Sequence, residues 1–219
     1  QQIMKKIALI FSAASLLMLA CNSDKKTEEG KMDEKTTETK MEDKEKMEMP
    51  DSATMMKNFQ EYGTPGDMHK MMATWDGTWN SELTMWMEPG APETKSTSMA
   101  ENKMIMNGLY QQSTHTGEMM GMPFNGLSTV GYDNHEKQFV STWIDNMGSG
   151  IMVMKGPWDD GTKTMNLKGK MTDPGTKSET EVRETFTIVD NDTQEMTMYV
   201  KMPDGSEFKT MHIKFTRKK

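Results

Sequence analysis

The chain has 219 residues, a formal net charge of −7 and a hydrophobic fraction of 34%. This length allows one domain or two small ones, and the low hydrophobic fraction indicates that part of the chain lies outside any packed core. The acidic balance argues against nucleic acid as a partner, and the single cysteine excludes an internal disulfide. Methionine, at 28 residues, is the compositional anomaly.

The first predicted element is a bacterial lipoprotein signal peptide over residues 1–21. Two lysines precede an apolar run over residues 7–19, which is too short to span a bilayer as a mature helix. The run leads into Ala20 and Cys21, a pair that resembles a lipobox, although the two residues before it differ from those that the motif prefers. An ordinary secretory signal with a chance cysteine is the alternative.

Cys21 is therefore the expected lipidation site and the expected mature N-terminus. Two or three acyl chains on one cysteine give stable membrane anchoring, whereas a single chain is marginal. In enterobacterial lipoproteins, an aspartate directly after the lipidated cysteine favours the inner membrane. This chain has Asn22 at that position, which indicates the outer membrane. We therefore expect the bacterial cell envelope, at the outer membrane, with the protein facing the periplasm or the surface. Residues 1–3 are interpreted as preceding a true start at Met4.

A charged linker is predicted over residues 22–57. Residues 22–50 contain no aromatic residue and no Val, Ile or Leu, so this segment cannot bury enough apolar area to offset the entropy of ordering it. We expect it to be disordered and to hold a domain, residues 58–219, away from the membrane. A metal-scavenging tail is the alternative, and its ligands would be Met32, Met41, Met47 and Met49.

One short amphipathic helix is predicted at the start of the domain. Thr64 is the expected N-cap, with Pro65 at the first helical position. An apolar stripe follows at i, i+3, i+4 and i+7, and Gly77 ends the helix. His69, beside the stripe, is expected to face solvent or to cap the helix. The stripe consists of Met68, Met71, Met72 and Trp75.

The remaining chain predicts an all-β domain. Turn signals recur from residue 88 to residue 205, among them NG, DNHE, DNMGSG, TDPGTK and PDG. They separate about ten segments of strand length, with no second helix. Sequential tight turns favour a single antiparallel up-and-down barrel, because closure removes exposed sheet edges. The short helix would then cap one end of the barrel.

Methionines recur two residues apart, and parity indicates where they point. Side chains alternate between the two faces of a strand. Near Met196 and Met198 the charged residues Glu195 and Lys201 fall on the opposite parity, and four other segments repeat this separation. Water takes the charged face, so these methionines are predicted to line the interior as core or as the wall of an apolar cavity. Thioether ligands for Cu(I) are the alternative.

Four stretches resemble the domain of unknown function 1579 family. They are PGDMHKMMATWDGTW, EPGAPETKSTSMAENKMIMNGLY, GYDNHEKQFVSTWIDNMGSGI and PDGSEFKTMHIKFTRKK, and the resemblance covers residues 58–218. It implies a calycin-like barrel, often secreted or lipid-anchored, with no settled activity. The chain departs from the family in its methionine excess and at Met211-His212.

The sequence holds no G-x-S-x-G, H-E-x-x-H, P-loop or G-x-G-x-x-G motif, so we expect a protein that is not an enzyme. Asp133 and Asp145 are interpreted as turn residues, and His115 as a residue at a cavity mouth. Inward polar groups need a partner or a ligand. The candidate pocket residues are Trp79, Met85, Asn102, Met104, Tyr110, Trp143, Met152, Met154, Glu184, Met196 and Met198.

Three functional hypotheses follow. The first is an envelope protein, anchored to the membrane through Cys21, that binds a small apolar ligand in a Met-lined barrel without a cofactor. The second is copper or haem binding, with Met152, Met154 and His212 as metal ligands. Calycin-like nitrobindins hold haem through a late histidine, which by resemblance would be His212. The third is a structural envelope lipoprotein with a filled barrel.

Overall fold

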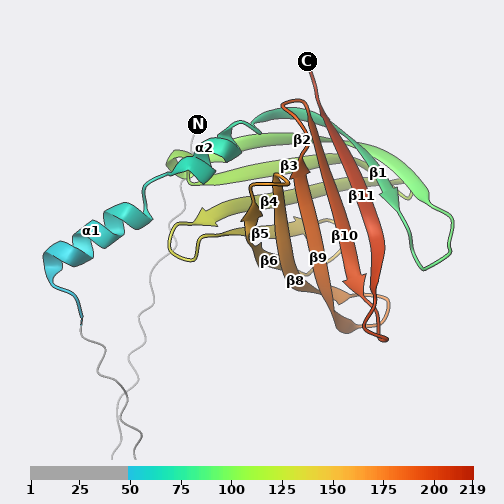
Figure 1. The fold of residues 1–219 in the computed structure, drawn as a ribbon. Coiled ribbons are helices and arrows are strands. Elements are labelled where there is room, and N and C mark those ends of the chain that lie inside the picture. Colours follow the sequence, from blue (N-terminus) through green and yellow to red (C-terminus); the bar gives the residue numbers. More distant parts are fainter. Residues whose placement is uncertain (1–48) are drawn as a thin grey trace, which may run out of the picture. The chain divides into compact units, whose positions relative to one another are not determined.

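A computed structural model describes residues 49–219, which form ten barrel strands, one extra strand and two helices (Figure 1). The helices are α1 (Ser52–Tyr62) and α2 (Asp67–Ala73), and a 3₁₀ turn, η1, spans Met106–Gly108. The strands are β1 (Gly77–Met85), β2 (Thr94–Ile105), β3 (Tyr110–Met119), β4 (Met122–Asp133), β5 (Gln138–Asp145), β6 (Met152–Gly156), β7 (Trp158–Asp159), β8 (Thr164–Asp173), β9 (Ser178–Ile188), β10 (Thr193–Lys201) and β11 (Glu207–Arg217).

The strands form one antiparallel sheet that closes on itself. Its order is β6-β5-β4-β3-β2-β1-β11-β10-β9-β8, with β7 added beside β8, and a pairing of β6 with β8 completes the circle. Neighbouring strands of the barrel are therefore consecutive in sequence, except where β11 pairs with β1 and where β8 pairs with β6. The predicted ten-stranded up-and-down barrel is confirmed.

Closure depends on two glycines at the β6–β8 seam. This seam has only three residue pairs, fewer than any other in the barrel. A Cβ on Gly156 would lie 1.8 Å from the Asn166 carbonyl oxygen, and one on Gly169 would lie 2.3 Å from the Val153 oxygen. The two strands can approach only because both positions lack a side chain.

The parity prediction for methionine is confirmed within the strands, whereas Met87 and Met106, which share the parity of Met85 and Met104, lie beyond the ends of β1 and β2 and are exposed. Met85, Met154 and Met165 are buried, and Met152 and Met196 pack against the core from the same faces of their strands. The alternating charged residues lie outside, where exposed pairs such as Lys201 with Glu181 form salt bridges. Methionine thus takes the core positions that Leu or Ile would fill in most barrels.

Helix α2 begins two residues later than predicted. Gly66, not Thr64, is the N-cap, and the His69 imidazole Nδ1 accepts a hydrogen bond of 3.0 Å from the Gly66 N–H. The Thr64 hydroxyl instead donates to the Gln60 carbonyl at the end of α1. His69 is only 2% exposed, so the capping role is confirmed and the solvent-facing one is wrong. The predicted stripe is confirmed, with Met72 and Trp75 fully buried.

Helix α1 was not predicted, and it begins inside the segment assigned to the linker. The Asp51 carboxylate caps it by accepting from the N–H groups of Ala53 and Thr54. The helix buries none of its residues, and Phe59 is 75% exposed, although Met55, Phe59 and Tyr62 recur at helical spacing in its sequence. The Asn134 amide ties its end to the β4–β5 turn by donating to the Tyr62 carbonyl.

Neither α1 nor α2 is long and apolar enough to cross a membrane, and no other α-helix occurs in residues 49–219. The predicted signal peptide, Cys21 and most of the predicted linker lie outside the described residues.

Candidate functional site

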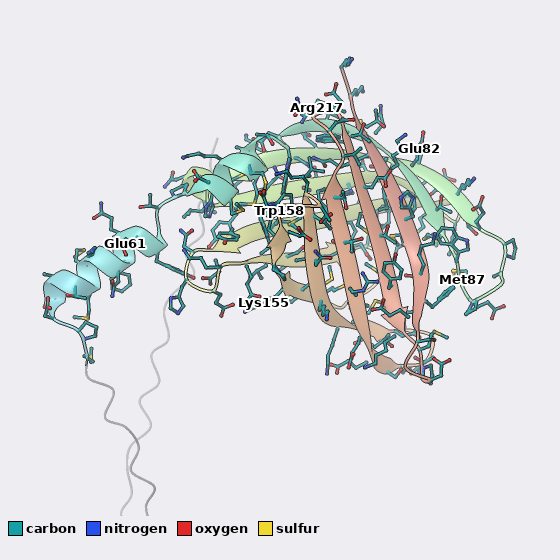
Figure 2. All side chains as sticks on the ribbon, viewed as in Figure 1. Glu61, Glu82, Met87, Lys155, Trp158 and Arg217 are labelled. Atoms are coloured by element: carbon teal, nitrogen blue, oxygen red, sulfur yellow. The ribbon has the colours of Figure 1, made fainter. Side chains whose placement is uncertain are left out.

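The barrel encloses a cavity of about 570 Å³. Helix α2 and Trp75 close one end, where they pack against Phe139 and Met165. The cavity reaches the other end, where the β5–β6 loop contributes Met147 and Ile151 to its lining. Arg217 and Met87 mark these two ends in Figure 2, Arg217 at the closed one and Met87 at the open one.

The two halves of the wall differ in chemistry. Strands β2 to β5 present five serines among larger side chains such as Met119, Phe124 and Trp143, whereas β1, β6, β8, β10 and β11 present eight thioethers. The hydroxyl half consists of Ser96, Ser98, Ser113, Ser128 and Ser141. The thioether half consists of Met85, Met152, Met154, Met165, Met171, Met196, Met198 and Met211. The small serine side chains leave open space in the barrel interior. The flexible methionine side chains of the other half face this space.

Aromatic rings cross the barrel interior beside the cavity. The His115 ring lies 5.0 Å from Trp143 and 6.3 Å from Phe215, measured between centroids. Phe215 continues to Phe186 at 6.1 Å, and Phe186 to Trp75 at 5.7 Å. These edge-on and tilted contacts are the geometries that aromatic pairs favour. The rings join the β3 wall to Trp75, two residues after the end of α2, and so border the cavity.

Polar side chains hold the end of α2 in place. The last carbonyls of a helix have no partner within it. Here Gln111 Nε2 donates to the Met72 carbonyl at 2.8 Å, while Trp79 Nε1 and Asn102 Nδ2 donate to the Trp75 carbonyl at 2.9 and 3.2 Å. Arg217 donates to the Asp76 carbonyl at 2.6 Å and stacks on the Trp79 ring. Trp79 and Asn102 therefore have a structural role at the closed end.

Glu184, on β9, is the acid inside the cavity. Burial raises the pKa of its carboxyl to about 7, because the charged form loses hydration. Its remaining accessible surface faces the cavity. Among residues 49–219 no side chain or backbone group donates a hydrogen bond to this carboxyl or forms an ion pair with it. Its cross-strand neighbours are Met198 and Leu167, which are both apolar.

His115 lies on the opposite wall, on β3. Four strands lie between β3 and β9 in either direction around the ten-stranded barrel. Burial lowers the pKa of the His115 imidazole to about 4, so the ring is neutral at physiological pH. The cavity thus holds one neutral base and one acid on facing walls.

Eight of the eleven candidate pocket residues line the cavity, and three do not. The eight are Met85, Asn102, Trp143, Met152, Met154, Glu184, Met196 and Met198. Trp79 lies in the closed end, 1% exposed, beneath Arg217. Met104 packs against the core near α2. Tyr110 is 44% exposed, and its ring lies over Gly131, where a Cβ would come within 2.7 Å of it.

The proposed metal set does not come together. Met152 and Met154 line the cavity, but His212 alternates with the inward Met211 and Ile213 and so faces outward. Its imidazole lies 3.6 Å from Glu195. Because His212 points away from the interior, the expectation that it would hold haem there is wrong. Residues 49–219 contain no group of three or more His, Cys, Asp or Glu placed to hold a metal ion.

Both predicted turn aspartates are confirmed. Asp133 accepts from the N–H groups of His135 and Glu136, each at 2.8 Å. Asp145 accepts from the Met147 N–H at 2.9 Å and from Trp143 Nε1 at 2.7 Å. The second bond fixes the indole of Trp143 in the cavity wall, beside His115.

The serine half of the wall, together with Gln111 and Gln194, was not among the predicted pocket residues. Ser96 and Ser98 share a parity opposite to Lys95 and Thr97. This alternation was the signal in the sequence that could have placed these serines inside the barrel. Because serine is not hydrophobic, the alternation does not appear as a hydrophobic pattern.

A family model and two solved structures resemble this chain, and the first of the two structures supports the fold. The family described as "Protein of unknown function (DUF1579)" matches residues 64–217. The crystal structure of Rv2717c from M. tuberculosis is similar at a TM-score of 0.54 and 10% identity, over 71% of this chain and 100% of that one. The S-type phycobiliprotein lyase CPES from Guillardia theta gives a TM-score of 0.46 and 10% identity, over 78% and 99%. No curated protein matches the sequence.

Proposed function

Since this chain belongs to the DUF1579 family, whose description assigns no activity, we propose from its cavity that it is a binding protein for a small, largely apolar molecule. The single observation that carries this proposal is the cavity of about 570 Å³ inside a closed barrel. Ligand sites in proteins typically measure roughly 300–1,000 Å³ and combine apolar walls with a few polar groups. The thioether half, the aromatic rings and the single interior acid fit that description.

The cavity exists because of the serine half of the wall. Protein interiors pack with few voids larger than a water molecule, and inward positions of small barrels are normally filled by side chains. Ser113 is 8% exposed and lies beside Ser128 on β4. Larger apolar residues at these positions would fill the space, so the open interior is encoded by particular residues.

We propose binding and not catalysis as the role of the interior polar groups. Within residues 49–219, no hydrogen bond joins an inward serine to His115 or to Glu184, which would be the usual activation of a hydroxyl nucleophile. His115 is packed between Trp143 and Phe215 instead. These groups are therefore assigned to wall structure and ligand contact.

Filling the cavity tests the proposal. Ser113→Phe places a ring in the interior, and Thr114→Phe adds the same ring on the exposed face of the same strand. We expect the full chain to bind the neutral dye Nile red, Ser113→Phe to bind it at least tenfold more weakly, and Thr114→Phe to match wild type. Equal dye binding by all three proteins would place the dye outside the barrel and refute the proposal.

A second candidate, Cu(I) binding, is favoured by one specific observation. Met85 pairs with Met211, and Met211 with Met198, so three thioethers on neighbouring strands face the same cavity. Soft thioethers select Cu(I) over harder ions. Ag(I), measured by calorimetry, is the soft-metal probe for this Cu(I) site. Replacing all three methionines by leucine removes the thioethers and should abolish Ag(I) binding. Because leucine keeps the side-chain volume, Nile red binding should persist. Unchanged Ag(I) binding would eliminate this site.

We further propose that Cys21 anchors the protein to the envelope, at the outer membrane. The support is the sequence that precedes the cysteine. Cys21→Ala should move the protein from the membrane fraction to the soluble fraction, and the wild-type chain should carry covalent acyl mass. A soluble wild-type protein without that mass would refute the anchor.

A further inference from the structure

The charge of the cavity lining is strongly one-sided. The carboxylate of Glu184 lies inside it, those of Glu118, Asp145 and Glu179 lie at its open end, and the single cation among the lining residues is Lys170, also at the open end. That lysine forms a 2.5 Å salt bridge with Glu179, and both side chains are more than half exposed at the open end. A cavity lined mainly by one sign of charge concentrates ligands of the opposite sign.

Glu184 is the acid that this balance leaves without a partner. Burying a carboxylate without a counter-charge is unfavourable, and the neighbouring Met198 and Leu167 provide none. The flanking Arg183 faces the other way and pairs with Glu207 on the outside of the barrel. A positive group from a ligand would supply both the missing charge and the missing hydrogen-bond donors.

The rest of the lining also suits a cation with an apolar body. Phe186 lies two residues from Glu184 on the same face of β9, and Phe215, Trp75 and Trp143 line the same space. Aromatic faces attract ammonium groups, most strongly where water is excluded. Methionine side chains add polarizable and adaptable contact for a hydrocarbon or aromatic body. An anionic ligand would find no unpaired cation among the lining residues and would be repelled by the carboxylates.

We propose that the cavity selects an apolar organic cation, with an amine or ammonium group placed against the Glu184 carboxylate. This assignment rests on the ligand-binding function proposed above and names its ligand class. The ligand enters at the open end, past Met147 and Ile151, and its apolar body lies between the aromatic rings and the thioethers.

A matched ligand series tests the assignment. Decylammonium, decanol and decanoate share one hydrocarbon chain and differ only in the head group. In calorimetric titrations of the full chain at pH 8, we expect decylammonium to bind at least tenfold more tightly than decanol, and decanoate to bind most weakly. In Glu184→Gln the preference for the amine should disappear, while the Kd of decanol changes by less than about threefold.

A control variant separates the carboxylate of Glu184 from the general acidity of the chain. Glu82→Gln removes one negative charge from the outward face of β1 (Figure 2) and should keep the amine preference. Tight binding of decanol with no amine preference in wild type would overturn the cation assignment and leave the binding function standing. No binding of any of the three compounds, together with no Nile red binding, would overturn both. If Glu184→Gln fails to fold, the order of the three ligands on wild type still decides the assignment.

Discussion

Replacing Glu184 by glutamine should stabilise the empty protein above neutral pH. Because burial raises the pKa of this carboxyl from 4.5 to about 7, the folded protein keeps a proton that the unfolded chain has already released between those pH values. The stability that protonation provides is complete below about pH 4.5 and is lost as the pH rises through 7. Glutamine keeps the shape and has no proton to lose.

The magnitude follows from the difference between the two pKa values. Each pKa unit corresponds to about 1.4 kcal/mol, so the full difference is at most about 3.4 kcal/mol. Solvent in the cavity partly screens the ionised carboxyl, so we expect Glu184→Gln to gain about 1–3 kcal/mol relative to wild type between pH 4.5 and pH 8.5.

Urea unfolding at the two pH values measures this gain. The slope of unfolding free energy against urea is about 2 kcal/mol per molar. The difference in urea midpoint between Glu184→Gln and wild type should therefore be about 0.5–1.5 M larger at pH 8.5 than at pH 4.5. Glu82→Gln, on the outward face, should change stability by less than about 0.5 kcal/mol at either pH. If Glu184→Gln is no more stable than wild type at pH 8.5, the carboxylate has a partner in the folded protein and the reasoning is wrong.

The other predictions concern the seam and the closed end. Gly156→Ala should destabilise the fold by about 1–3 kcal/mol, because its Cβ would meet the Asn166 carbonyl, whereas Gly148→Ala, with nothing within 4 Å, should be nearly neutral in thermal unfolding. Arg217→Lys should cost about 1–3 kcal/mol, since a lysine cannot bond the Thr74 and Asp76 carbonyls together. An equal loss from Lys214→Met, on the outward face of β11, would show that charge alone matters there.

Sequential turn signals were sufficient to predict the barrel, and strand parity was sufficient to predict its methionine wall. Met196, Met198 and their charged neighbours report their faces through a local alternation that survives in the folded chain. The same rule placed Glu184 inside correctly, because Phe186 and Ile188 share its parity. Periodicity therefore predicted the features that depend on one strand at a time.

The closed end could not be predicted in this way. Asn102 and Trp79 bond the Trp75 carbonyl, and this pairing requires that α2, β1 and β2 already meet. His69 displaced Thr64 from the capping role because its imidazole reaches the Gly66 N–H, a contact that an N-cap rule based on hydroxyl residues does not include. Tyr110 was misplaced because β3 begins only there, where its ring lies over Gly131.

The native mass spectrum of the full chain purified from cells tests the central claim most directly. The account predicts one stoichiometric compound of excess mass that is lost on denaturation, which distinguishes it from covalent lipid at Cys21. Ser113→Phe should lose this compound and Thr114→Phe should keep it. A wild-type spectrum that shows only the polypeptide and its covalent modifications, from a protein that also fails to bind Nile red, would contradict the claim that the barrel is a ligand-binding site.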